Sequence, residues 1–98
     1  MYSVKSLRQF RKEQISAIDQ YVDIHKAFFC ESVYRDLTFS ATKTRETIVS
    51  MLCDSDFELN VIVHGETIVG FHEFAFENPW MEEEVALCVN FYIAPEHR

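Results

Sequence analysis

The sequence predicts an α+β domain with an antiparallel sheet, in which one strand and two helices precede a run of three strands. Two observations lead to this fold class. Apolar residues in the first half recur at three- and four-residue steps, the spacing of amphipathic helices. In the second half they alternate or run continuously, and short polar connections separate the runs, as in antiparallel strands. We therefore expect a single domain over residues 1–98.

A change of spacing separates the first strand from the first helix. Tyr2, Val4 and Leu7 alternate with polar residues, which predicts a short strand. From about Lys12 the spacing becomes helical, and the predicted helix ends near Cys30 or Glu31. Its apolar stripe consists of Ile15, Ile18, Val22, His25 and Phe29, widened by Tyr21, Ile24 and Phe28.

A loop and a second helix follow. Residues 31–40 have no clean period, which predicts a loop rich in aromatic side chains. Ser40 or Thr42 is expected to cap the next helix, because a hydroxyl oxygen can accept from the free N–H groups of a first turn. This helix is expected to end near Cys53, before the polar stretch 54–56.

Two strands joined by a tight turn come next. Residues 57–63 alternate and predict a strand with one buried face, and Gly65 permits the positive φ of a turn. Residues 67–76 return as the antiparallel partner, with apolar side chains on both faces. Gly70 inside that strand predicts a bulge or a close backbone approach. We expect Val69, Phe71 and Ala75 on one face and Ile68, Phe74 and Phe76 on the other.

The last strand is the most apolar part of the chain. Seven of the eight residues from Leu87 to Ala94 are apolar or aromatic, which predicts a strand buried on both faces, and Pro95 ends it. Two helices can cover only one face of the sheet. We therefore expect the other face, and the free edge of this strand, to be covered by a second copy of the chain or by another protein partner.

The distribution of charged and apolar residues indicates which classes of ligand and which compartment to expect. The net charge of −7 is concentrated in the second half: residues 1–46 carry eight basic and six acidic side chains, and residues 47–98 carry one and ten. This distribution argues against nucleic-acid binding. It suits a cationic amine substrate or a partner that normally binds nucleic acid, and it is also typical of a solvated acidic surface. The absence of a long apolar run or a signal peptide predicts a cytoplasmic protein with no membrane contact.

Cysteine and histidine spacing predicts no metal site. Three cysteines form no C-x-x-C pair and are expected to be reduced core thiols, and the four histidines are not clustered as zinc ligands are. The cysteines are Cys30, Cys53 and Cys88, and the histidines are His25, His64, His72 and His97.

The closing segment FYIAPEHR, from Phe91 to Arg98, resembles the fourth strand of the GNAT N-acetyltransferase superfamily and the start of its cofactor motif, [QR]-x-x-G-x-[GA]. Arg98 corresponds to the first position of that motif. The preceding order of elements resembles the first half of the family's fold. The resemblance implies an enzyme that transfers an acetyl group from acetyl-CoA to an amine, represented here by its N-terminal half.

The resemblance also implies binding residues. The backbone of Phe91, Tyr92 and Ile93 would contact the pantetheine arm of acetyl-CoA, and Arg98 would begin its phosphate loop. Tyr34 and Arg35 lie in the segment that borders the acceptor pocket in this family. They are candidate acceptor contacts, or else they pin the loop to the core.

The catalytic base is the least defined part of this resemblance. Some family members carry a glutamate base six residues before the position of Ile93, and here that position is Leu87. Glu73 and Glu84 are the candidate replacements, and His72 is another. His25 is either a base or a hydrogen-bonded histidine at the edge of the core.

The motif glycines do not follow Arg98 in these 98 residues, so we expect this chain to bind acetyl-CoA weakly and to lack turnover. An alternative function is a non-catalytic, acidic interaction or inhibitor protein on a truncated acetyltransferase scaffold. An unrelated α+β domain is a third interpretation.

Overall fold

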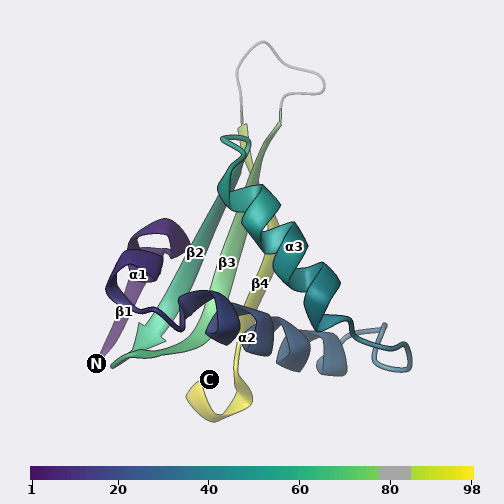
Figure 1. Ribbon diagram of the computed structural model, residues 1–98. Coiled ribbons are helices and arrows are strands. Elements are labelled where there is room, and N and C mark those ends of the chain that lie inside the picture. The colour runs from purple at the N-terminus through teal and green to yellow at the C-terminus, as the bar shows by residue number, and fades with distance from the viewer. Residues whose placement is uncertain (78–84) are drawn as a thin grey trace.

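A computed structural model describes the backbone of residues 1–77 and 85–98, and the side chains of residues 1–76 and 89–98. The predicted α+β fold class is confirmed (Figure 1). Four antiparallel strands form one sheet in the order β1-β2-β3-β4, and the helices pack on one of its faces. The elements are β1 (Tyr2–Ser6), α1 (Leu7–Glu13), α2 (Ala17–Glu31), α3 (Ala41–Leu52), β2 (Phe57–His64), β3 (Thr67–Glu77), β4 (Val85–Ile93) and the 3-10 turn η1 (Pro95–His97).

The predicted first helix is in fact two helices. Leu7 opens α1 and is not part of the strand, because the Ser6 hydroxyl accepts from the backbone N–H of Gln9 and caps a helix there. The chain is extended at Gln14 and turns helical again only at Ala17. Ile15 falls in this break with its side chain fully exposed, so its assignment to the apolar stripe was wrong.

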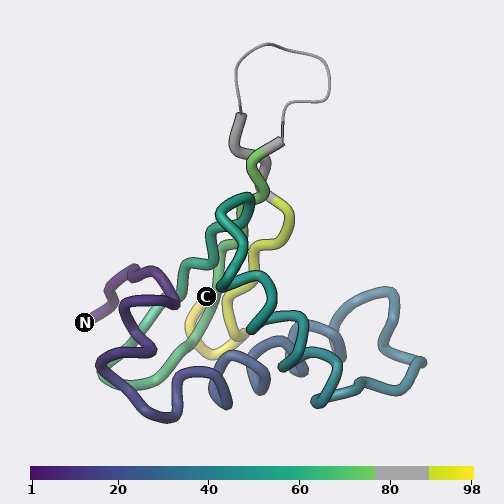
Figure 2. Tube along the Cα trace, turned by 45° about the horizontal axis from the view of Figure 1, so that its top comes forward, coloured from purple at the N-terminus to yellow at the C-terminus, as the bar shows by residue number. Residues whose placement is uncertain are grey.

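The second helix and its preceding loop are confirmed. The Ser40 hydroxyl accepts from the backbone N–H of Lys43 at 3.2 Å and caps α3, which ends at Leu52. Figure 2 shows that the loop between α2 and α3 projects beyond the sheet. The thiols of Cys30 and Cys53 are exposed, which corrects the expectation of core thiols for these two cysteines; the side chain of Cys88 lies outside the described residues.

Gly70 marks the close approach that the sequence predicted. A Cβ atom on Gly70 would lie 2.5 Å from the backbone oxygen of Tyr92 on β4. The β2–β3 register also shifts between Ile62 and Val63, opposite Ile68 and Gly70. This bulge brings Ile68 into the core cluster, so strict alternation, which assigned Val69 to the face of Phe71, was wrong there.

Glu73 pairs with Asn90 of β4 in the same register that pairs Phe71 with Tyr92, and a second register shift follows between Glu73 and Phe74. Glu73 is therefore on the face that α2 and α3 cover, together with the core. Among the described side chains, this core contains fifteen buried residues: Leu7, Phe10, Ala17, Tyr21, Val22, Ile24, Ile48, Leu52, Leu59, Val61, Val63, Ile68, Phe71, Tyr92 and Ala94.

The other face of the sheet, which we call the outer face, is open. Val4, Val89 and Phe91 are 69%, 53% and 55% exposed. The prediction that the helices of this chain cover only one face of the sheet is confirmed, because no described helix packs on the outer face (Figure 1). Burial of Val89 and Phe91 by a second copy or by another partner stays a prediction. Among the described residues, no helix is long and apolar enough to cross a membrane.

Candidate active site

A buried carboxylate is the centre of the candidate site. Glu73 on β3 is 2% exposed, and three side chains donate to its carboxylate or share a proton with it. The Tyr21 hydroxyl and Nε2 of His25, both on α2, contact Oε2, the latter at 2.9 Å. Nδ2 of Asn90 on β4 donates to Oε1 at 2.9 Å. One helix and two strands thus converge on a single acidic group.

These contacts fix the ionisation of Glu73. Burial alone would raise the pKa of its carboxyl, but hydrogen bonds from His25, Tyr21 and Asn90, with the charge of His25, outweigh burial and hold the pKa below 4.5. Burial and the charge of Glu73 in turn raise the pKa of the Tyr21 phenol. Glu73 is therefore a carboxylate at neutral pH and Tyr21 a neutral donor.

Aromatic rings hold the His25 imidazole in place. It is stacked on Phe71 with centroids 4.4 Å apart and planes 8° apart, and the Tyr21 ring meets it edge-on at 4.8 Å. Since Glu73 is ionised, Nε2 of a neutral His25 carries the proton and donates it to the hydrogen bond. Nδ1 then has a free lone pair, the arrangement of a histidine oriented by a carboxylate to act as a base.

Two cavities border His25. One, of about 290 Å³, contains Glu73 and Asn90 in its wall; the other, of about 260 Å³, extends toward the α2–α3 loop. Both are also lined by Lys43 and Thr44 of α3. The site is thus a pair of small adjoining hollows with His25 between them.

The structure places only one of the two predicted acceptor contacts at the cavities beside His25. Tyr34 lines the 260 Å³ cavity. Arg35 is exposed and lines neither of the two cavities. The structure therefore brings Tyr34, but not Arg35, near His25.

His72, another predicted base, lies apart from this centre. His72 is next to Glu73 on β3 but on the outer face, where its ring contacts Phe74 and Phe91 at centroid distances of 4.2 and 5.2 Å. Glu84 lies outside the described residues.

The predicted cofactor contacts lie at the end of β4. Phe91 faces outward, whereas Tyr92 is buried and its hydroxyl donates to Glu31. Burial, then the hydrogen bond and charge of Glu31, raise the pKa of Tyr92 to about 12. Arg98 donates from Nε to the carbonyl oxygen of Ile93 at 2.7 Å and lies over the Tyr92 ring, so its guanidinium closes the end of the strand.

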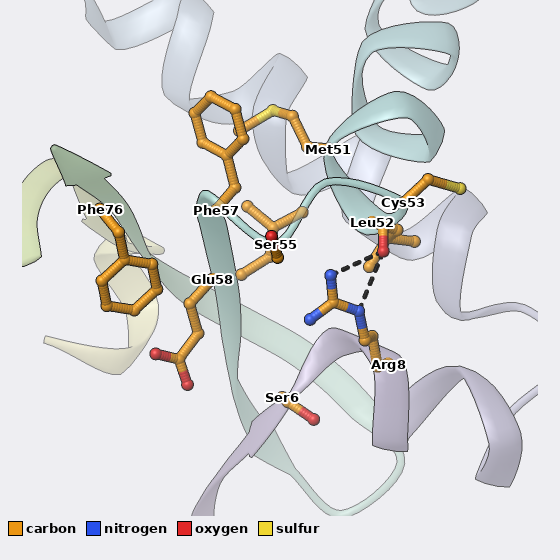
Figure 3. Close-up of a pocket in the computed structure, with 10 residues that line it drawn as sticks. Ser6, Arg8, Met51, Leu52, Cys53, Ser55, Phe57, Glu58 and Phe76 are labelled. Carbon is orange, nitrogen blue, oxygen red and sulfur yellow. Dashed lines mark hydrogen bonds between the residues drawn. The ribbon is translucent and has the colours of Figure 1, made fainter.

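A further cavity, of about 380 Å³, is in a different place, between β2, α1 and the end of α3 (Figure 3). The Arg8 guanidinium donates there to the carbonyl oxygen of Leu52 at 2.7 and 2.9 Å, capping α3. Neither Glu73 nor any histidine lines it. We interpret it as a packing gap where α1 and the end of α3 meet β2, and not as the active site.

Sequence reasoning missed Tyr21 and Asn90 as members of the site. Both had a signal. Asn90 is the one polar residue within the apolar run of the last strand, and Tyr21 precedes His25 by four residues, which is one helical turn.

Two solved structures superpose on nearly the whole chain. A possible acetyltransferase from Clostridium difficile matches 100% of it with a TM-score of 0.76 and 11% sequence identity. An aminoglycoside antibiotic 6'-N-acetyltransferase from Acinetobacter baumannii matches 99% with a TM-score of 0.67 and 9% identity. The chain therefore has a GNAT-like fold. It spans 60% of the length of either structure.

The GNAT-like fold agrees with the resemblance of the Phe91–Arg98 segment and with the order of elements before it. No family model matches the sequence, and no curated protein sequence does. At such low identity the structural matches show the fold, and the chemistry has to be argued from the residues of the site.

Proposed function

We propose that this chain forms the amine-binding part of an acetyl-CoA-dependent N-acetyltransferase, with His25 as the general base. The observation that carries the proposal is the buried Glu73 carboxylate, which holds Nε2 of His25 at 2.9 Å on a GNAT-like fold. A carboxylate that is 2% exposed cannot itself reach an amine in solution. Its use is to orient the histidine and to stabilise the imidazolium that forms.

The chain's own residues supply the proton transfer. An acceptor amine in the cavity beside His25 attacks the acetyl carbonyl carbon, forming the C–N bond, and its proton passes to Nδ1 of His25. Glu73 balances the new positive charge, and Tyr21 and Asn90 keep the carboxylate in position. Acetyl-CoA, when bound, supplies the acetyl group, and its thiol sulfur leaves with the electrons of the C–S bond.

The end of β4 partly fits the expected cofactor. The strand pairs with β3 along one edge, and no described strand pairs with its other edge, so the backbone of Phe91 and Tyr92 can hydrogen-bond an extended arm. The carbonyl oxygen of Ile93 is taken by Arg98. Phe91, Tyr92 and Ile93 remain the residues we propose to hold acetyl-CoA, and Arg98 must move to free the Ile93 carbonyl.

Acetyl transfer by the protein at its full natural length tests the proposal. His25→Gln should lower kcat by about 100-fold or more, the usual effect of losing a general base. His72→Gln, the same change on the outer face, should leave kcat within about twofold of wild type, as expected for a base that is not involved. Absence of transfer to every amine in a broad panel, or full activity of His25→Gln, would refute the proposal.

A second candidate function is protein binding through β4. The exposed side chains of Val89 and Phe91 lie beside the edge of β4, which no described strand covers. We propose that a second copy of the chain pairs along this edge, since an open apolar edge strand is a template for another strand. Sedimentation of the 98-residue chain should show a dimer that Phe91→Lys dissociates; a wild-type monomer at micromolar concentration would contradict this.

The proposed compartment is the cytoplasm. Exposed thiols at Cys30 and Cys53 suit a reducing environment, where they would not form disulfides.

A further inference from the structure

The two cavities beside His25 share one cationic residue in their lining. Lys43 lines both, and its ammonium group forms no ion pair with any described residue. Lys43 also lies in the first turn of α3, where the helix dipole adds partial positive charge. A ligand in either cavity therefore meets positive charge on the α3 side.

No accessible carboxylate balances that charge. Glu73 is the one acidic side chain among the described residues that line these cavities, and its two oxygens are already engaged by Tyr21, His25 and Asn90. An acceptor with several ammonium groups would face Lys43 without a counter-charge. An acceptor with its own carboxylate would find a partner in Lys43.

Aromatic rings form much of the remaining wall of the 260 Å³ cavity, with Ser32 and Ser40 beside them. Its wall contains four aromatic rings from α2 and the loop that follows, namely Phe28, Phe29, Tyr34 and Phe39. Rings of this kind suit an apolar or aromatic body and not a sugar-like polycation.

We infer that the acceptor is a small amine that carries both a carboxylate and an apolar or aromatic body, as an apolar α-amino acid does. This inference rests on the proposed function. The amine lies at His25, the carboxylate at Lys43, and the apolar body among the rings of Phe28 and Phe39. The aromatic loop before α3 is then the part of the chain that selects the substrate.

Three matched probes test the inference: phenylalanine, phenylalaninamide and phenethylamine, with the protein at its full natural length. Phenylalanine should have a kcat/KM about tenfold above the other two, the value of one charge-assisted contact. Lys43→Met should remove this advantage by raising KM for phenylalanine, and Lys43→Arg should keep it. Lys26→Met, an exposed lysine that lines neither cavity, is the control.

Binding of the same probes without acetyl-CoA, followed by NMR shifts of residues 25 and 40–44, separates the two proposals. Transfer to all three probes at equal rates overturns the acceptor class and leaves the acetyltransferase function standing. Binding of phenylalanine that depends on Lys43, without transfer to any amine, supports the acceptor class and refutes the function. Equal binding of all three probes, or no binding, overturns the inference.

Discussion

Glu73 on β3 and His25 on α2 are 48 positions apart in the sequence. Oε2 of Glu73 nevertheless lies 2.9 Å from Nε2 of His25, on the face of the sheet that the helices cover. The contact depends on the packing of α2 against β3 and on the alternation that places Glu73 on the same buried face as Phe71. It joins the helical layer to the sheet through an acidic group that is almost wholly removed from water. Its consequences for stability can be measured in the 98-residue chain.

Glu73→Gln should lower the free energy of unfolding by about 2 kcal/mol at neutral pH, because three hydrogen bonds lose their charged acceptor. The pKa of Glu73 is lowered in the folded protein, so its contribution is present above pH 4.5 and is lost as the pH falls through the folded-state pKa. Denaturant unfolding at several pH values should show wild type and variant converging in acid. Glu66→Gln, at the exposed β2–β3 turn, should behave as wild type throughout; a constant difference at every pH would contradict the assignment.

Tyr21→Phe should cost about 1 kcal/mol of stability, since it removes one neutral donor from a buried carboxylate. The pKa of Glu73 should rise, which moves the acid unfolding midpoint to higher pH. Tyr34→Phe is the matched control, because Tyr34 is 60% exposed and its hydroxyl is not among the groups that hydrogen-bond Glu73. An unchanged acid midpoint in Tyr21→Phe would show that this hydroxyl does not stabilise the charge.

Tyr92 should ionise about two pH units above an ordinary tyrosine, with a pKa of about 12 against 10.0. Because the folded-state value is raised, its contribution to stability is complete below pH 10 and is lost as the pH rises through about 12. An ultraviolet titration of the folded chain should contain this late step, and Tyr92→Phe should remove it. Absence of a step near that pH that Tyr92→Phe removes would be inconsistent with the Glu31 contact.

Gly70→Ala should destabilise the fold by about 1–3 kcal/mol, because the new methyl group would lie 2.5 Å from the Tyr92 backbone oxygen. The strands must separate locally, so amide hydrogen exchange in β4 should accelerate most. Gly65→Asn is the comparison: nothing lies within 4 Å of its Cβ position, and asparagine tolerates the positive φ of 66°. Equal destabilisation by both changes would mean that turn strain, and not crowding, is being measured.

The sequence was sufficient for elements whose signal is local. The helix cap at Ser40, the turn at Gly65 and the close approach at Gly70 follow from the chemistry of single residues, and the sequence predicts all three. The break between α1 and α2 was not predicted, because Ile15 continues the helical spacing although its side chain is exposed. Periodicity alone cannot distinguish an apolar residue in a connection from one on a buried stripe.

The site was predicted only in part for a similar reason. Glu73 is a candidate from the sequence, but its partners are 17 to 52 positions away; the pairing of β3 with β4 brings Asn90 to it, and the packing of α2 on β3 brings Tyr21 and His25. The sequence predicts that His25 is either a base or a core-edge histidine, and the stacking on Phe71 with the contact to Glu73 shows that it is hydrogen-bonded at the edge of the core. That position is also what the proposed base requires.

The nitrogen NMR spectrum of the His25 ring is the most direct test of the central claim, that a buried carboxylate prepares this histidine to accept a proton. At a pH where the ring is neutral, we predict a proton on Nε2, facing Glu73, and an unprotonated Nδ1; Glu73→Gln should disturb this preference. A neutral ring with its proton on Nδ1, or one unaffected by Glu73→Gln, would contradict the account.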